Sequence, residues 1–267
     1  MNAVFMLRIT AGSASLECLV NGVPACYLPA GIADTRSFNI GHLLQSGAND
    51  LVTVLGPNPF AEKYLEDWIK PTAQTDLGLS TIRLEIVRFA DKEGVSSTGG
   101  EVVAWREWQV ERSARPRTYQ VGFVVGDAVP RWQWSRAERW PSRLAAISTV
   151  EPFVVGLHRA LVEGRVEPIL EANEPRLRDA CTAFDWNFEE MLDGMKQVLL
   201  EKLRSGHLVQ PLHPQTWSWR LLRDGALLEV TRGERDPVLV LANPATGDEV
   251  QLPLVIGMLD GSPRLLA

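Results

Sequence analysis

The histidines are where a search of this sequence for catalytic or metal chemistry begins. His42, His158, His207 and His213 are scattered, and no two have the spacing that places a pair of imidazoles on one helix face. The chain also has no glycine-rich phosphate loop and no nucleophile elbow. We therefore expect no catalytic residue, no metal ligand and no cofactor, and a protein that is not an enzyme.

The strongest chemical signal is a block of acidic residues. From Glu151 to Asp193 there are ten acids and four arginines, a charge of −6 that equals the formal net charge of the whole chain. Like charges in one segment oppose folding by self-repulsion, so a functional reason is expected, with a merely solvated face as the alternative. The acids predicted to bind a basic protein partner are Glu163, Glu167, Glu171, Glu174, Asp179, Glu189, Glu190 and Asp193.

Tryptophans and arginines interleave just before this block, in residues 130–144. Such a segment can form a stacking platform or a cation–π interface, or it can be a domain junction filled by Trp and covered by Arg stems. We include Trp132, Trp134, Arg136 and Trp140 among the candidate partner-binding residues. The prolines at 130 and 141 predict a domain boundary near residue 145.

Composition limits the class of protein. A chain of 267 residues exceeds the usual domain of about 100–150, so two domains are expected. A net charge of −6 argues against a nucleic-acid binder. The start of the chain lacks a basic region followed by an apolar run, and no segment approaches the roughly 20 apolar residues of a membrane span. We expect a cytoplasmic protein that does not bind membranes.

Three cysteines suggest buried thiols in a reducing compartment. Cys18 and Cys26 flank an Asn21-Gly22 turn signal. A two-residue loop sets Cys18 opposite Ala25, whereas a three-residue loop would set the two cysteines opposite each other. The sequence leaves open whether they pair.

The first half predicts strands at 3–10, 15–20, 23–28, 51–55, 79–90, 101–110 and 118–125, with a short helix within 57–71. Its turn and core signals are carried by Asn21, Gly22, Phe38, Ile40, Leu43, Leu44, Gly47, Asn49, Leu51 and Thr53. Their order resembles the galactose-binding-like jelly rolls that accompany many glycosidases. The resemblance implies an antiparallel β-sandwich over residues 1–145 and does not imply sugar binding, because fold does not imply function.

The second half changes to helical periodicity. One helix is expected to begin at an N-cap on Thr149, and a second to begin after Asn173 with Pro175 in its first turn and to end near Phe184. A third should span 187–204, with Asn187 and Glu190 as a capping pair. Strands at 216–222, 226–232, 237–242 and 249–256 follow, and their short connections predict one antiparallel meander.

This order of elements predicts an α+β fold with helices packed on a meander sheet over residues 146–267. It resembles the cone-shaped nuclear-transport-factor-2-like family, which contains both enzymes and binding domains. In the enzymes a histidine and an acid project into the mouth of the cone. The resemblance would place that pair at His213 and Asp185.

An acidic, cytosolic, two-domain chain without a catalytic motif resembles the bacterial immunity proteins that neutralise secreted toxins, including those of type VI secretion. The resemblance implies a non-enzymatic protein that occludes the basic groove of a nuclease-like toxin with an acidic face. The alternative is a small-molecule-binding or enzymatic protein of the nuclear-transport-factor-2-like kind with an accessory carbohydrate-binding-like sandwich.

Overall fold

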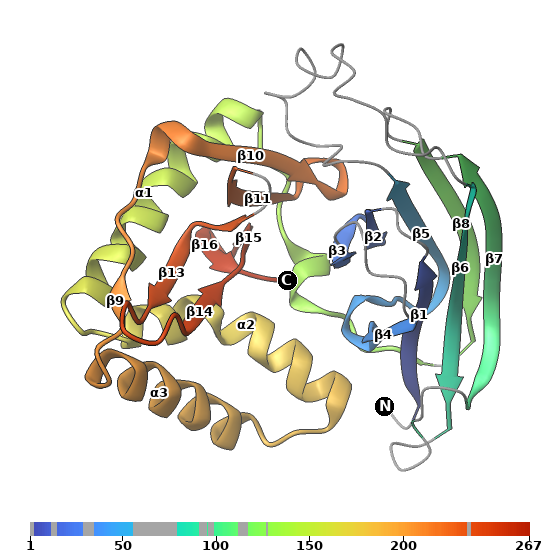
Figure 1. The fold of residues 1–267 in the computed structure, drawn as a ribbon, viewed down its shortest axis with the longest axis horizontal. Helices are drawn as coiled ribbons and strands as arrows, with labels where there is room; N and C mark the ends of the chain where they lie inside the picture. The colour runs from blue at the N-terminus through green and yellow to red at the C-terminus, as the bar shows by residue number, and fades with distance from the viewer. Residues whose placement is uncertain are drawn as a thin grey trace. The chain divides into compact units, whose positions relative to one another are not determined.

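The computed structural model describes residues 3–11, 15–28, 35–55, 79–90, 95, 99–111, 117–126, 128–233 and 236–267. The chain divides into two compact units, Met1–Arg131 and Trp132–Ala267, and each described sheet lies within one unit. Antiparallel sheets and three helices make the described part of the chain α+β, as predicted (Figure 1). The short helix predicted within 57–71 lies outside the described residues.

The first unit contains two four-stranded antiparallel sheets in its described part, which gives it the predicted β-sandwich-like character. One sheet has the order β4 (Thr35–Asn39), β1 (Val4–Ala11), β6 (Leu79–Phe89), β7 (Glu101–Glu111). The other has the order β3 (Val23–Leu28), β2 (Leu16–Val20), β5 (Gly47–Leu55), β8 (Arg117–Val125). In β8, Val121, Phe123 and Val125 are buried and the residues between them are exposed, so alternate side chains face the core.

The residues that carry the jelly-roll resemblance hold turns together. Asn21 has a left-handed conformation (φ 52°), and its Nδ2 donates to the carbonyl of Leu43 and to Oδ1 of Asn49, each at 2.8 Å. Asn49 is buried, and its side chain exchanges hydrogen bonds with the backbone of Gln45. These asparagines therefore satisfy buried backbone groups of the turns, which is a structural role.

The second unit has two sheets where the sequence predicted one meander. A five-stranded sheet has the order β10 (Trp217–Leu222), β11 (Leu227–Arg232), β15 (Leu254–Leu259), β16 (Ser262–Leu265), with β12 (Asp236–Pro237) also paired to β11. A three-stranded sheet has the order β14 (Glu249–Leu252), β13 (Leu239–Ala242), β9 (Leu208–Val209). Pro253, which has no N–H for a ladder, divides the predicted strand 249–256 into β14 and β15. The prediction of a single meander was wrong because β11 pairs with β15 and leaves β13 and β14 to the other sheet.

Three helices accompany these sheets: α1 (Arg143–Val162), α2 (Glu167–Phe184) and α3 (Phe188–Arg204). The start of α3 is confirmed, since the Asn187 side chain accepts from the N–H groups of Glu189 and Glu190. Two other predicted starts were wrong. The cap of α1 is Ser142 and not Thr149, and α2 begins at Glu167 with a proline at 168 in its first turn, which leaves Pro175 inside the helix.

The core of the second unit lies between α1, α2 and the sheets. Side chains of α1, including Val150, Val154 and Leu161, pack in one cluster with Leu228 and Ile256 of the five-stranded sheet. α1 is the one described helix that is long and apolar enough to cross a membrane, by length and composition only. About 33% of that apolar stretch is buried within the structure, including the residues that pack in this cluster. α2 contacts both β16 and α3.

Candidate functional site

The tryptophans of the segment 132–140 are buried. Trp132, Trp134 and Trp140 are 1%, 0% and 8% exposed. The guanidinium of Arg223 lies 4.6 Å from the ring centroid of Trp134 and donates to its carbonyl oxygen at 2.7 Å. The three tryptophans are thus not available to a partner, and their place in the predicted interface is corrected. Arg136 is exposed and lies 3.8 Å from Asp260.

This segment belongs to the second unit. The N–H of Glu138 donates to the carbonyl of Met258 at 3.0 Å, and the N–H of Trp140 donates to Gly225 at 2.9 Å. The chain is therefore divided between residues 131 and 132, earlier than the predicted boundary near 145.

Asp179 is an internal acid. Its side chain on α2 is 5% exposed, and both carboxylate oxygens accept the N–H of Gln133, at 3.0 and 2.8 Å. Burial raises the pKa of Asp179 to about 7, against the opposing effects of the N–H groups of Gln133 and Trp134 and the charge of Arg136. Asp179 fastens the 3₁₀ turn η4 (Gln133–Arg136) to α2, so it is corrected from a partner-binding acid to a structural one.

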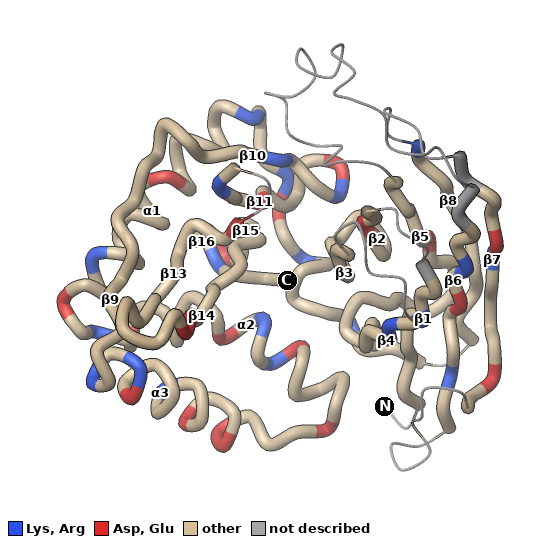
Figure 2. Tube along the Cα trace, in the orientation of Figure 1, with Lys and Arg blue, Asp and Glu red and all other residues tan. Residues whose placement is uncertain are grey.

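The other predicted acids on α2 and at the end of α1 are exposed or half-buried, and each is matched by a cation. The ion pairs are Glu163 with Arg165, Glu167 with Lys196, Glu171 with Arg264, and Glu174 with Arg178. Two of these cations, Lys196 and Arg264, stand outside the 151–193 segment. Figure 2 shows lysines and arginines among the acids of both helices. The charge count of the segment therefore overstates the free negative charge on this part of the surface.

The outward face of α3 differs from α2. Six of its residues recur at intervals of three and four, which places them on one side of the helix, and all six are exposed. They are Glu190, Asp193, Gly194, Gln197, Val198 and Glu201, and we call them the α3 face. Within the part of the chain that the structure describes, its three acids and the neighbouring Glu189 have no cation within salt-bridge distance. This is the free negative charge of the helical block.

α3 also leaves apolar surface uncovered. Leu199 is its one fully buried residue, and Val198 is 48% exposed. Trp186, just before the helix, is 50% exposed. At Gly194 an added Cβ would meet no atom within 4 Å, so no close approach in the described chain requires a glycine there. Glycine in a helix interior costs about 1 kcal/mol relative to alanine, so its presence in the middle of this face is unexplained by packing.

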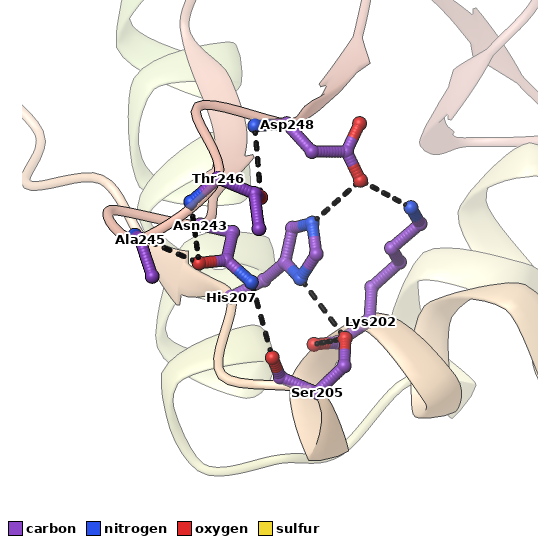
Figure 3. A network of polar contacts seen from close by, with 7 residues as sticks. All are labelled: Lys202, Ser205, His207, Asn243, Ala245, Thr246 and Asp248. Atoms are coloured by element: carbon purple, nitrogen blue, oxygen red, sulfur yellow. Dashed lines mark hydrogen bonds and ion pairs between the residues drawn. The ribbon is translucent and has the colours of Figure 1, made fainter.

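A polar network holds the C-terminal end of α3 (Figure 3). Ser205 Oγ lies 3.1 Å from His207 Nδ1, and His207 Nε2 lies 3.0 Å from Asp248 Oδ2. Lys202 Nζ donates to the same Asp248 oxygen at 2.5 Å, and Asn243 Nδ2 donates to the carbonyl of Ser205 at 3.1 Å. The hydrogen bond from Lys202 lowers the pKa of Asp248 most, and the hydrogen bond from His207 lowers it further. The network joins α3 to the turn between β13 and β14.

An open hollow of about 420 Å³ adjoins this network, lined by Gln197, Glu201, Arg204 and Ser205. The hollow thus lies between the α3 face, which contributes Gln197 and Glu201 to its lining, and the network, which contributes Ser205. The hollow has the size and the charged lining to accept a polar side chain or small polar group.

The sequence did not single out His207 or Asp248. They meet because β9 pairs with β13, with Leu208 opposite Ala242, which brings the residues just before β9 beside those just after β13. A two-residue strand leaves no periodic signal. The residues that the sequence did name, Asp185 and His213, are both exposed, and Asp185 ends α2 in the left-handed conformation (φ 53°).

Among the described residues, no group of three or more His, Cys, Asp or Glu side chains could hold a metal ion. No protein-family model, no curated protein and no solved structure matches the chain. Its function is therefore inferred from its own surface and polar contacts, of which the α3 face and the Ser205–His207–Asp248 network are the two candidates.

Proposed function

We propose that this protein is a non-enzymatic binding protein that holds a basic protein partner through the α3 face. The observation that carries the proposal is the free charge of Glu190, Asp193 and Glu201, which are exposed and have no cationic partner among the described residues. Acids with no internal partner are available to steer a basic protein and to pair with it at contact.

The uncharged members of the α3 face support the same interpretation. Val198, which lies between Asp193 and Glu201 along the helix, offers exposed apolar area of the kind found at the centre of protein interfaces. Trp186, exposed just before the helix begins, adds aromatic area beyond the N-terminal end of the face. Gly194 lets the backbone or a side chain of a partner approach the helix closely. Charge at the edges and exposed apolar area between them are the usual composition of a protein-binding surface.

The proposal extends to the partner class. A protein whose function is to bind nucleic acid, such as a nuclease, presents a basic groove, and an acidic helix face is complementary to it in charge. We therefore propose an immunity protein that neutralises a cognate, cytosol-acting, nuclease-like toxin by occluding its groove. Glu163, Glu167, Glu171 and Glu174 remain secondary contacts in this proposal, because each already has a cationic partner.

Capture from the native cell tests the proposal when it is made with two charge-matched variants. The first, Glu190→Lys, Asp193→Lys and Glu201→Lys, reverses the α3 face. The second, Glu138→Lys, Asp236→Lys and Glu249→Lys, reverses three exposed acids elsewhere in the same unit. Both variants bring the formal net charge from −6 to 0, so a difference between them reports position and not total charge.

We expect the wild-type protein and the second variant to retain the same basic protein, which high salt releases, and the α3 variant to lose it. Purified partner then gives the affinity directly, and a toxic partner gives a growth assay for protection. Equal capture by both variants would contradict the proposal.

A second candidate function follows from the Ser205–His207–Asp248 network. The side chains form a chain of nucleophile, base and orienting acid, and Ser205 is exposed at the hollow. Such a chain is one of the requirements for serine-dependent acyl transfer. Ser205 Oγ also donates to the carbonyl of Lys202 at 3.0 Å, so its one hydrogen must turn to His207 before that base can remove it.

A fluorophosphonate probe distinguishes this candidate, because such probes label activated serines and leave unactivated ones unmodified. The enzymatic alternative predicts one adduct on Ser205 that disappears in Ser205→Ala and falls strongly in His207→Asn. Absence of labelling in the wild-type protein excludes the alternative and leaves the network as a structural link.

A further inference from the structure

Cys18 and Cys26 lie directly opposite each other in neighbouring strands. The Asn21-Gly22 turn has positive φ angles at both residues, as a type I′ hairpin turn requires. A regular ladder from that turn would place Cys18 opposite Ala25. An irregularity between Cys18 and Leu19 omits Ala25 from the pairing, and Cys18 then faces Cys26. The bulge therefore creates the cysteine pair.

The backbone geometry of such a pair already suits a disulfide. Directly opposed residues in antiparallel strands have Cα atoms about 4.5–5.5 Å apart, within the roughly 4.4–6.8 Å that disulfides span. The two side chains are in hydrogen-bond contact, and both cysteines are free thiols.

The two thiols differ in access. Cys18 is fully buried, and its Sγ lies 3.6 Å from the hydroxyl of Thr53. Cys26 is only partly buried, on β3, which ends the described sheet. A reagent in solution therefore meets Cys26 first, and Cys18 is placed to act on any sulfur that Cys26 acquires.

We propose that Cys18 and Cys26 form a reversible redox site that reacts with low-molecular-weight disulfides of the glutathione type. The Cys26 thiolate attacks one sulfur of the reagent, which releases one thiolate and forms a mixed disulfide. The Cys18 sulfur then attacks the Cys26 sulfur, releases the second thiolate and closes the Cys18–Cys26 bond. Two protein thiols lose two electrons and two protons, and the reagent is reduced to two thiols.

The local electrostatics make this a slow site at neutral pH. The hydrogen bond with Cys18, burial and the charge of Glu17 raise the pKa of Cys26 well above its ordinary value. Because the thiolate is the attacking form, reaction should accelerate in alkaline buffer. Cys18 and Glu17 both belong to β2. The strand to which Cys26 would be linked is therefore also the strand whose side chains raise the pKa of Cys26 and slow the formation of the disulfide.

The Cys18–Cys26 disulfide would restrain β3, the edge strand of the described sheet. An edge strand has unpaired backbone groups and can open or pair elsewhere. A covalent link from β3 to β2 fixes the bulged register and prevents such opening. The reduced and oxidised proteins should therefore differ in the hydrogen exchange of β3 amides.

Intact mass of the full-length protein after exposure to glutathione disulfide tests the proposal. Wild type and Cys181→Ser should each lose two hydrogens and should then resist iodoacetamide in denaturant at positions 18 and 26. Cys18→Ser, which keeps the accessible thiol and lacks the second, should instead accumulate one glutathione adduct on Cys26. Cys26→Ser should stay unmodified at position 18.

The wild-type mass does not depend on any variant folding. The proposal is overturned if Cys18 and Cys26 both remain open to alkylation in the treated wild type. It is equally overturned if the only disulfides formed involve Cys181 or link two protein molecules.

Discussion

α2 and α3 are neighbouring helices with similar numbers of acids and different uses for them. On α2 the acids point to cations or into the protein: Glu167, Glu171 and Glu174 form ion pairs, and Asp179 is buried beneath η4. On α3 the acids point outward and have no cation among the described residues. The comparison separates acids that organise the fold from acids that are available for binding.

The difference also shows what a charge count along a sequence can conceal. A window adds charges that are close in the chain, whereas pairing depends on charges that are close in space. Lys196 and Arg264 neutralise α2 acids from outside the window. The two helices differ in how many of their acidic side chains are free of a cation, and not in how many acids they contain.

The largest expected effect is on the folding of the second unit when residues 132–145, part of which α2 holds in place, are removed. Residues 132–142 are joined to α2 through Asp179, to β15 through Met258 and to the turn between β10 and β11 through Gly225. A fragment 132–267 should therefore fold and unfold cooperatively on heating, whereas 146–267, cut at the boundary predicted from the sequence, should lack stable tertiary structure. Circular dichroism melts of the two fragments measure this, and equal cooperative folding of 146–267 would contradict the structural role given to α2.

Asp179→Asn should remove a pH dependence of stability. The pKa of Asp179 is raised from 3.8 to about 7 by burial, so the folded state keeps a proton that the unfolded state releases between those pH values. The stability gained is complete below about pH 4 and is lost as the pH rises through 7, at up to about 1.4 kcal/mol per pH unit. Urea denaturation from pH 5 to 8 should show this slope in wild type and a smaller slope in Asp179→Asn. Parallel curves would argue that the carboxyl is already ionised at pH 5.

Charge reversal should have opposite consequences on the two helices. Reversal of Glu190, Asp193 and Glu201 should slow association with the partner by about tenfold or more at low salt and leave the melting temperature near wild type. Reversal of Glu167, Glu171 and Glu174 places lysines beside existing cations and should lower the melting temperature more than it slows association. Stopped-flow association and thermal melts of both triple variants compare the helices directly. A larger association defect in the α2 variant would exchange their assigned roles.

The smallest effect belongs to two exposed helix glycines. Gly194→Ala should stabilise the free protein by about 0.5–1 kcal/mol, because alanine restricts the unfolded chain and neither position has a neighbour within 4 Å. Gly156→Ala on α1 is the matched control and should give a similar gain. Only Gly194→Ala should weaken partner binding in titration calorimetry. Equal binding by the two variants would show that the partner does not approach α3 at its centre.

Features set by neighbouring residues were predicted well from the sequence. The Asn187 cap of α3 and most strands of the first unit depend on local patterns and were predicted to within a few residues, whereas β4 was not among the predicted strands. Prolines were more ambiguous, because Pro168 and Pro175 both suit a first helical turn and only packing decides between them. Ser142 caps α1 in preference to Thr149 for the same reason.

Features set by distant residues could not be predicted. The burial of Asp179 depends on η4 returning to α2, and the cation for Glu171 comes from Arg264 at the end of the chain. The meeting of His207 with Asp248 requires the pairing of β9 with β13. Cys18 and Cys26 lie opposite each other only because of a β-bulge, and no residue type in the turn predicts that bulge. In each case the partner is fixed by topology and not by local pattern.

The polar network at the end of α3 has a consequence for binding. Asn187 holds the first turn of the helix, and the contacts among Lys202, Ser205, His207 and Asp248 hold the last. A helix held at both ends should fray less, so a partner that binds it has less backbone to order. The conformational entropy lost on association is then confined to a few side chains, which leaves more of each contact's free energy for affinity.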